Sequence, residues 1–131
     1  MGMYSSNSLG NNAPDVVPIT KTDTQPYLQG GSLADGTYYR TEIDNYSGTA
    51  VTTASRSTLS IAGLSWSLVT RDGTGADVRS SGAIDALGTM LSLNQSCPSS
   101  QHLAFSYDAS TPMKLLMLDN NTELLSVYTK Q

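Results

Sequence analysis

The sequence predicts an all-β fold, an eight-stranded antiparallel up-and-down meander barrel behind an irregular N-terminal arm. Short runs of alternating apolar and polar residues recur about every 8–12 residues after residue 35, which is typical of sandwiches and barrels. Charged residues make up only 14% of the 131 residues. Ser, Thr, Asn and Gly replace them, and this composition suits polar outer faces of strands better than exposed faces of helices. Short turn sequences separate the runs, so consecutive strands should pair as antiparallel neighbours.

The chain divides near residue 34. Residues 1–34 contain several prolines, the Gly30–Gly31 pair and many Ser, Asn and Thr residues, which interrupt any regular apolar period. We predict a flexible arm or tether that lies over the surface and contributes at most an edge strand. Residues 35–131 are then expected to form the barrel.

The first four strands are predicted from alternation that ends at glycine or aspartate. They are residues 36–46, 57–63, 64–70 and 78–84. In the third of these runs Trp66, the chain's only tryptophan, lies between two serines and so points to one face. The sequence "RDGTGAD" after this run has the residues of a turn.

The last four strands follow the same pattern. They are residues 89–95, 102–107, 113–118 and 123–130. The segments "CPSSQ", "DASTP" and "DNNT" between them carry the Pro, Asp, Asn and Ser residues that favour turns. Both faces of the last two runs are apolar, so we expect the N-terminal arm or a second copy of the chain to cover their outer face.

Closure into a barrel is favoured because an open meander would leave one apolar face bare and two strand edges unpaired. Alternation then assigns one face of each run to the interior. The predicted inner set is Tyr39, Ile43, Leu59, Ile61, Leu64, Trp66, Leu68, Val78, Ile84, Leu91, Leu93, Leu103, Phe105, Leu115, Met117, Leu124 and Tyr128.

Three stretches carry a family resemblance. The chain has "GTYYR" at the first predicted strand, "LSWSLVTRDG" followed by "GTMLSL" in the middle, and "FSYDASTPMKLLMLDNNTELLSVYTK" at the end. In this order and spacing of strands and turns, the chain resembles the lipocalin-like, calycin-type small barrels of bacterial envelope lipoproteins. Tyr38 takes the position of the tryptophan with which such barrels begin. Lys130 takes the position of the cation that packs near it at their closed end.

The resemblance implies an eight-stranded barrel that binds a small apolar molecule without catalysis. It also implies an extracytoplasmic protein, secreted or in the bacterial cell envelope, because residues 4–35 are similar in composition to the tethers of such lipoproteins. A lipid anchor would then lie upstream of this chain, on a natural N-terminus that Met1 and Gly2 replace. The start of the chain has no apolar stretch of the kind found in a signal peptide.

Charge argues against two classes of partner. The net charge is −4, and the 7 lysines and arginines are scattered along the chain. No cluster could neutralise a run of phosphates, so we expect no nucleic-acid binding and no attraction to an anionic membrane surface. No apolar run approaches the ~18 residues of a membrane span.

Residues for nucleophilic catalysis or metal binding are sparse, so no enzyme, cofactor or metal site is predicted. His102 is the sole histidine, and "GLSWS" is not the Gly-x-Ser-x-Gly elbow of serine hydrolases. Cys97 and His102 lack the two further ligands that zinc needs. Haem ligation would require His102 to point inward, out of register with Leu103. We expect His102 at the surface and Cys97 as a half-buried small residue.

Carboxylates give no acid–base pair. Glu42 and Glu123 fall on predicted outer faces or turns, and most aspartates mark turns. The segments "DGTGAD" and "DNNTE" offer oxygen ligands at short spacing but match no calcium loop. Adventitious calcium binding is the one metal alternative that stays open.

The remaining candidate site is the barrel interior. Tyr39, Trp66, Phe105, Met117 and Tyr128 could line an apolar pocket in which two hydroxyls orient a ligand. The alternative is that they fill the interior, because an eight-stranded barrel is just wide enough to be filled by its own side chains. Two functions follow: a non-catalytic extracytoplasmic protein that binds a small apolar ligand in the barrel, or a structural or protein-interaction module of the cell envelope with a filled barrel.

Overall fold

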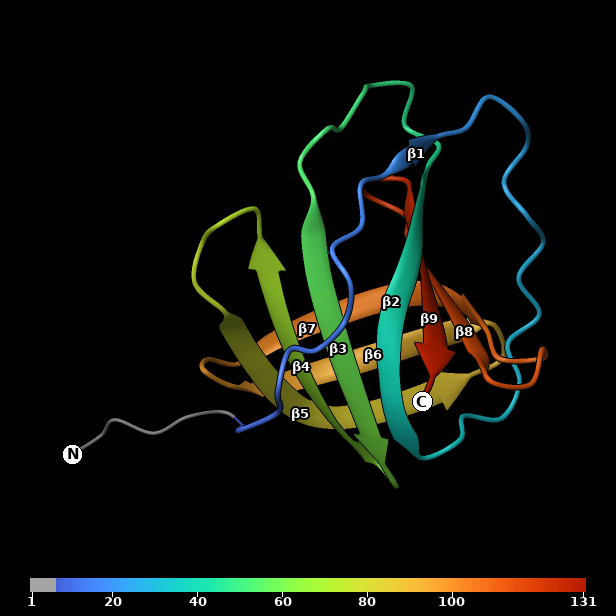
Figure 1. Ribbon diagram of the computed structural model, residues 1–131. Helices are drawn as coiled ribbons and strands as arrows, with labels where there is room; N and C mark the ends of the chain where they lie inside the picture. The colour runs from blue at the N-terminus through green and yellow to red at the C-terminus, as the bar shows by residue number, and fades with distance from the viewer. Residues whose placement is uncertain (1–6) are drawn as a thin grey trace.

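Alternating side chains along eight strands produce a closed antiparallel barrel (Figure 1). The computed structural model describes residues 7–131. Each strand pairs with the next in chain order, and pairing of the first with the last closes the barrel. The predicted fold class is confirmed. The barrel strands are β2 (Gly36–Asn45), β3 (Ser55–Ala62), β4 (Ser65–Asp72), β5 (Val78–Leu87), β6 (Met90–Cys97), β7 (Gln101–Asp108), β8 (Lys114–Asp119) and β9 (Leu124–Lys130).

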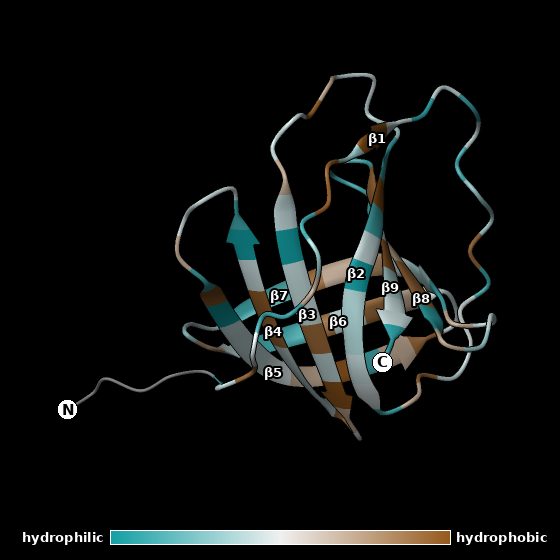
Figure 2. Ribbon diagram, viewed as in Figure 1, coloured by the Kyte–Doolittle hydropathy of each residue, from teal (hydrophilic) through white to brown (hydrophobic). Residues whose placement is uncertain are grey.

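The two ends of the barrel differ. The turn end carries the β3–β4, β5–β6 and β7–β8 connections, and the loop end carries the β4–β5, β6–β7 and β8–β9 connections and the longest one, β2–β3. Strands β3 and β4 change from brown, apolar residues near the turn end to teal, polar residues near the loop end (Figure 2). Within residues 7–131 the structure has no helix of the length and apolarity that crossing a membrane requires.

An apolar core fills the turn end. Trp66 is 1% exposed and pairs with Ile61 on β3 and Gly82 on β5. Its indole Nε1 donates a hydrogen bond of 2.9 Å to the carbonyl oxygen of Ala83, so the polar atom of the ring is satisfied. Leu33 of the arm packs against this core. The core comprises Tyr38, Leu59, Ile61, Trp66, Ile84, Leu91, Leu93, Tyr107, Leu115, Met117 and Tyr128.

Polar side chains take over the interior toward the loop end. Ser57 and Ser55 continue the inner face of β3 beyond the apolar residues, and their partners on β4 are Thr70 and Asp72. The Ser57 hydroxyl lies 3.2 Å from that of Thr70 and 3.1 Å from that of Tyr128. The interior is therefore apolar at one end and polar at the other.

The predicted inner position of Tyr39 is wrong, because β2 contains a bulge. Arg40 pairs with Tyr128 and Glu42 with Val127, so Thr41 is an extra residue on β2. The extra residue shifts the alternation by one, and Tyr38 therefore faces inward although it lies an odd number of residues from Ile43, which is also buried. Tyr39 lies on the outer face, and Arg40 faces the interior.

Two further members of the predicted inner set are exposed. Leu64 is 78% exposed because Ala62 pairs with Ser65, which leaves Leu64 in the two-residue β3–β4 turn. Val78 is 67% exposed because it begins β5 at the rim of the loop end, beyond the core. In both cases the alternation continues past the point where the barrel interior ends.

The arm inserts between β2 and β3. These two strands pair only from Gly36 to Tyr39 on β2, and they diverge toward the loop end (Figure 1). The short strand β1 (Ile19–Thr20) pairs parallel to the end of β2, and Val16 exchanges two backbone hydrogen bonds of 2.7 and 3.0 Å with Ser55 on β3. We term this gap, with the arm residues 16–20 that close it, the seam.

The apolar outer face of β8 and β9 is covered, as predicted, and the arm is the cover. Leu28 packs on Leu118 and Leu125 in a small cluster outside the barrel. Gly30 then forms a bridge to Asp108 on β7. The division near residue 34 and the flexibility of residues 1–34 stay predictions, and residues 1–6 lie outside the described part of the chain.

Candidate functional site

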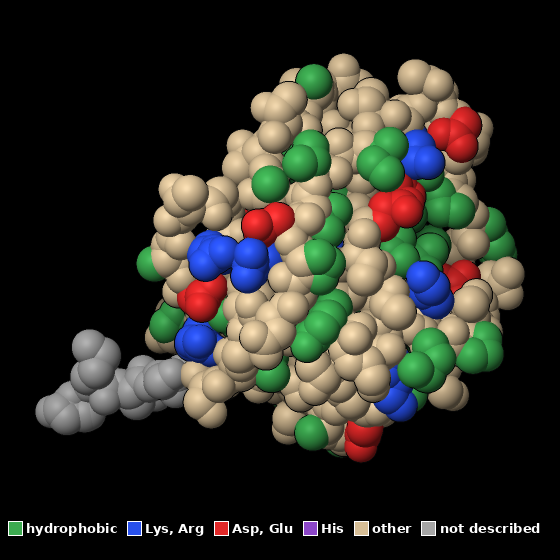
Figure 3. Space-filling view, in the orientation of Figure 1, with side chains coloured by type: hydrophobic (Ala, Val, Ile, Leu, Met, Phe, Trp, Pro, Cys, Tyr) green, Lys and Arg blue, Asp and Glu red, His purple; other side chains and the backbone are tan. Residues whose placement is uncertain are grey.

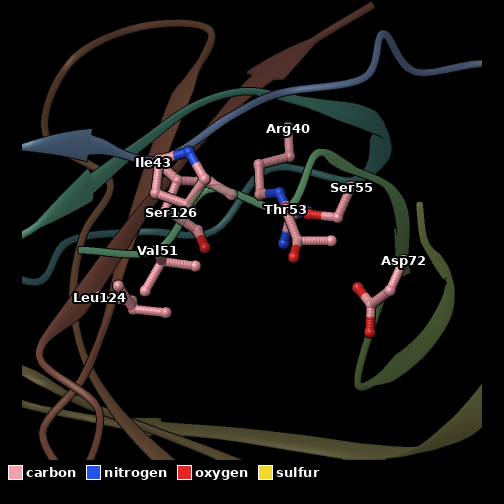
Figure 4. Close-up of a pocket in the computed structure, with 9 residues that line it drawn as sticks. Arg40, Ile43, Val51, Thr53, Ser55, Asp72, Leu124 and Ser126 are labelled. Carbon is pink, nitrogen blue, oxygen red and sulfur yellow. The ribbon is translucent and has the colours of Figure 1, made fainter. Parts of the chain in front are cut away.

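A cavity of about 470 Å³ opens inside the barrel at the loop end (Figure 4). Its volume lies within the range of about 300–1,000 Å³ that is usual for small-molecule sites. Strands β2, β3, β4 and β9 contribute inward-facing side chains, and the β2–β3 loop and the arm complete the wall. The lining residues are Pro18, Arg40, Ile43, Val51, Thr53, Ser55, Asp72, Leu124 and Ser126.

Small side chains on two facing strands leave this space empty. Ser55 continues the inner face on which Leu59 and Ile61 fill the turn end, and Ser126 continues the inner face of the bulky Tyr128. Protein interiors are close-packed, so serine at positions where the same strand elsewhere carries a large side chain leaves volume unfilled. The seam adds to it, because β2 and β3 lie apart on that side.

Arg40 is the principal charged group of the cavity. Its Nη2 donates a hydrogen bond to the Ser55 hydroxyl, whereas its Nε is buried and has no hydrogen-bond partner among the described residues. A buried donor left unpaired costs about 1–3 kcal/mol, and more when it is charged. An unpaired guanidinium nitrogen beside a cavity therefore favours an acceptor supplied by a ligand.

Asp72 supplies the opposite charge on the far side of Ser55. It is the cross-strand partner of Ser55 and projects toward the cavity (Figure 4). The ion pairs found among residues 7–131 join Arg56 to Asp15 and Arg79 to Asp77, so Arg40 and Asp72 are not paired with each other.

Most of the remaining lining is apolar, and Thr53 and Ser126 are its polar members. Ile43, Val51 and Leu124 form one side of the cavity (Figure 4), and Pro18 of the arm closes it at the seam. This arrangement can hold a molecule that has both charged and apolar parts. Among residues 7–131, no group of three or more His, Cys, Asp and Glu side chains is placed to hold a metal ion.

The residues that the sequence singles out for ligand binding do not line this cavity. Trp66, Phe105 and Met117 lie in or against the core, and Tyr39 lies on the outer face. Trp66 borders an open hollow on the outer surface beside Gly82. Tyr128 comes nearest, because it pairs with Arg40 and its hydroxyl contacts Ser57, one inner position below Ser55.

Sequence reasoning misses three of the polar residues that line the cavity, Arg40, Ser55 and Asp72, for identifiable reasons. The bulge at Thr41 hides the inward position of Arg40, and Asp72 has the sequence context of a turn. Ser55 lies before the predicted start of its strand. The sequence contains one signal for the inward position of Ser55. Leu59 and Ile61 are two residues apart and share a face of the strand, and the same spacing continues back through Ser57 to Ser55.

The other candidate residues are placed as predicted. His102 is exposed, and its Nδ1 lies 2.9 Å from Oδ1 of Asn94 on the neighbouring strand. Cys97 is a free, half-buried thiol at the end of β6. On the face shown in Figure 3, basic and acidic side chains are interspersed.

Asp44 is a buried carboxyl beside the seam. It is 7% exposed, pairs with Ile19 of β1, and its Oδ1 has no hydrogen-bond partner among the described residues. Burial, a hydrogen bond with Glu42 and the charge of Glu42 raise its pKa to about 6. Ionised Asp44 therefore destabilises the arrangement in which the arm lies on β2.

Replacing Asp44 by asparagine should stabilise the fold at neutral pH. The pKa of Asp44 is about 6 in the folded protein, compared with 3.8 for an ordinary aspartate. The stability that protonated Asp44 contributes is therefore complete below pH 3.8 and is lost as the pH rises through about 6. We expect Asp44→Asn to raise the free energy of unfolding at neutral pH by about 1 kcal/mol, after a discount for solvent screening. Urea unfolding from acidic to neutral pH checks this, with exposed Asp85→Asn as control. Parallel pH profiles of variant and parent protein would contradict it.

Comparison with known proteins identifies no family for this barrel. No family model matches the chain, and no curated protein or solved structure is detectably similar to it. Fold and site together define a small antiparallel barrel with a cavity of mixed polarity at one end.

Proposed function

We propose that the protein binds a small molecule in the cavity at the loop end of the barrel and does not catalyse a reaction on it. The observation that carries this proposal is the buried, unpartnered Nε of Arg40 beside a cavity of about 470 Å³. Small-molecule sites combine an apolar wall with a few placed polar groups, and Arg40, Ser55 and Asp72 are such groups here.

The cavity supports a different ligand from the apolar one that the sequence predicts. A wholly apolar molecule would leave the buried Nε of Arg40 without an acceptor and would offer no opposite charge to Asp72, which is exposed to solvent. A ligand with an acidic group and an apolar part would satisfy Arg40 and contact Ile43, Val51 and Leu124. We therefore favour a small amphipathic carboxylate over a hydrocarbon-like ligand.

Loss of the Arg40 charge should weaken binding. We expect a panel of octanoate, leucine, N-acetyl-leucine and leucinamide, measured by isothermal titration calorimetry, to contain at least one ligand that binds at one site per chain. Arg40→Met should weaken its binding by tenfold or more, because a hydrogen bond to a charged group contributes about 1.5–3 kcal/mol. Lys114→Met removes the same charge from an exposed position and should leave binding unchanged. No binding by any member, or equal binding by Arg40→Met, would refute the proposal.

We also propose that the protein works outside the cytoplasm, at the bacterial cell envelope or as a secreted protein. The Ser-, Asn- and Pro-rich composition of residues 1–34 and the resemblance to envelope lipoproteins support this. Fractionation of cells that express the natural protein would test it. Recovery in the cytoplasmic fraction alone would refute it.

The second candidate is a structural or protein-interaction module. Its specific support is that Trp66, Phe105 and Met117, expected to line a pocket, instead pack in or against a filled core. The argument for a homodimer is weaker than the sequence indicates, because Leu28 of the same chain covers the outer face of β8 and β9. A strict monomer in light scattering that binds one of the four ligands would favour the first function over this one.

A further inference from the structure

The charges of the cavity point to the class of its ligand. We infer that it binds a zwitterion, a free amino acid with an apolar side chain or a short apolar peptide. This inference rests on the proposed function and deepens it. Arg40 would take the carboxylate and Asp72 the ammonium group, with the side chain against Ile43, Val51 and Leu124.

The position of Arg40 sets where the carboxylate binds. Its Nη2 donates to the Ser55 hydroxyl, and its buried Nε is a donor that has no hydrogen-bond partner among the described residues. A carboxylate accepts two parallel hydrogen bonds from a guanidinium, a geometry that adds specificity as well as binding energy. A carboxylate oxygen that reaches Nε would supply the acceptor that this donor lacks.

The position of Asp72 sets where the ammonium group binds. Asp72 lies directly opposite Ser55 on β4, and the Cβ atoms of such cross-strand neighbours are about 4.5–5.5 Å apart. Ser55 is also the residue that holds Arg40. One serine is thus flanked by a cation and an anion, and all three residues line the same cavity.

The alternatives fit less well. A plain carboxylate such as octanoate would bring a second negative charge near Asp72, and a plain amine would bring a second positive charge near Arg40. A ligand with both charges meets an opposite charge at each end and leaves the cavity neutral overall. The volume of about 470 Å³ corresponds to roughly fifteen water molecules at about 30 Å³ each, which accommodates a large amino acid or a dipeptide.

Matched analogues of leucine test the inference in calorimetric titrations at neutral pH. N-acetyl-leucine lacks the ammonium charge and leucinamide lacks the carboxylate, whereas all three share the side chain. We expect leucine or leucyl-leucine to bind at least about tenfold more tightly than either analogue, because each analogue loses a charged hydrogen bond. Asp72→Asn should abolish the preference for leucine over N-acetyl-leucine and leave the binding of N-acetyl-leucine unchanged. Asp85→Asn, exposed on the outside of β5, is the matched control and should preserve the preference.

The outcomes separate this inference from the function on which it rests. If octanoate or N-acetyl-leucine binds as tightly as leucine and Arg40→Met weakens that binding, the zwitterion is refuted and the binding function is upheld. If Asp72→Asn retains the preference for leucine, the role of Asp72 is refuted. If none of these probes binds to the folded protein, as judged by circular dichroism, both proposals are refuted.

Discussion

Replacing Trp66 by alanine should lower the free energy of unfolding by about 3–5 kcal/mol, the range for deleting a fully buried aromatic side chain. Trp66 is 1% exposed and lies in the main core at the turn end. The substitution removes the indole, leaves a cavity that the closed barrel cannot easily collapse, and frees the Ala83 carbonyl oxygen from its bond to Nε1. Urea denaturation followed by circular dichroism measures the change.

The control lies two residues away on the same hairpin. Leu64 has 78% of its surface exposed in the β3–β4 turn, so Leu64→Ala should change stability by no more than about 0.5 kcal/mol. Sequence alternation alone places both side chains inside, and the structure separates them. Similar losses for the two variants, or a loss below about 1 kcal/mol for Trp66→Ala, would contradict this placement.

Replacing Gly82 by alanine should cost about 3 kcal/mol, at the upper end of the range for overpacking. A Cβ atom on Gly82 would lie 2.0 Å from the carbonyl oxygen of Asn94 and 2.8 Å from the Cα atom of Gln95. These are backbone atoms of the paired strand β6, so no side-chain rotation relieves the clash. The strain arises at the register shift between Ser81 and Gly82, where the two backbones come close. Thermal and urea unfolding both report the loss.

A second glycine separates steric cost from conformational cost. Gly48 in the β2–β3 loop has a φ of 81°, but a methyl group at this position would meet no neighbouring atom within 4 Å. Gly48→Ala should therefore cost only about 1–2 kcal/mol from the unfavourable φ. Gly82 does not have a positive φ, and its cost is therefore steric. Equal losses at the two positions would show that the β5–β6 pair shifts to accept the methyl group.

The fold could be predicted from the sequence because alternation and short turns are local properties. Each strand shows them in its own residues, whatever the other strands do. Trp66 is placed correctly for this reason. Alternation fails where a bulge adds one residue to a strand, as Thr41 does in β2. The residues of β2 that precede Thr41 then face the opposite side from the one that alternation predicts. Alternation also fails at strand ends, where Leu64 and Val78 keep the pattern although no interior remains for them.

The candidate site could not be predicted in the same way, because an empty volume is a property of several strands together. Ser55 and Ser126 are ordinary serines in the sequence, and they leave a cavity only because barrel closure makes both face one interior. The position of Pro18 in the cavity wall depends on the seam, which no periodicity in residues 1–34 indicates. The sequence predicts no catalytic group, and the proposed function keeps this as a prediction.

The seam has a consequence for how a ligand exchanges. The arm is held across it by few bonds, among them the two between Val16 and Ser55 and one of 2.8 Å from the Lys21 amide to the Asn45 carbonyl oxygen. Detachment of residues 16–20 would open the cavity wall beside Pro18 and would leave the pairing of β2 with β9 intact. Local openings of this kind require less free energy than global unfolding. Amide hydrogen exchange at Val16 and Lys21 should therefore be faster than in the core strands, and bound ligand in the cavity should slow it.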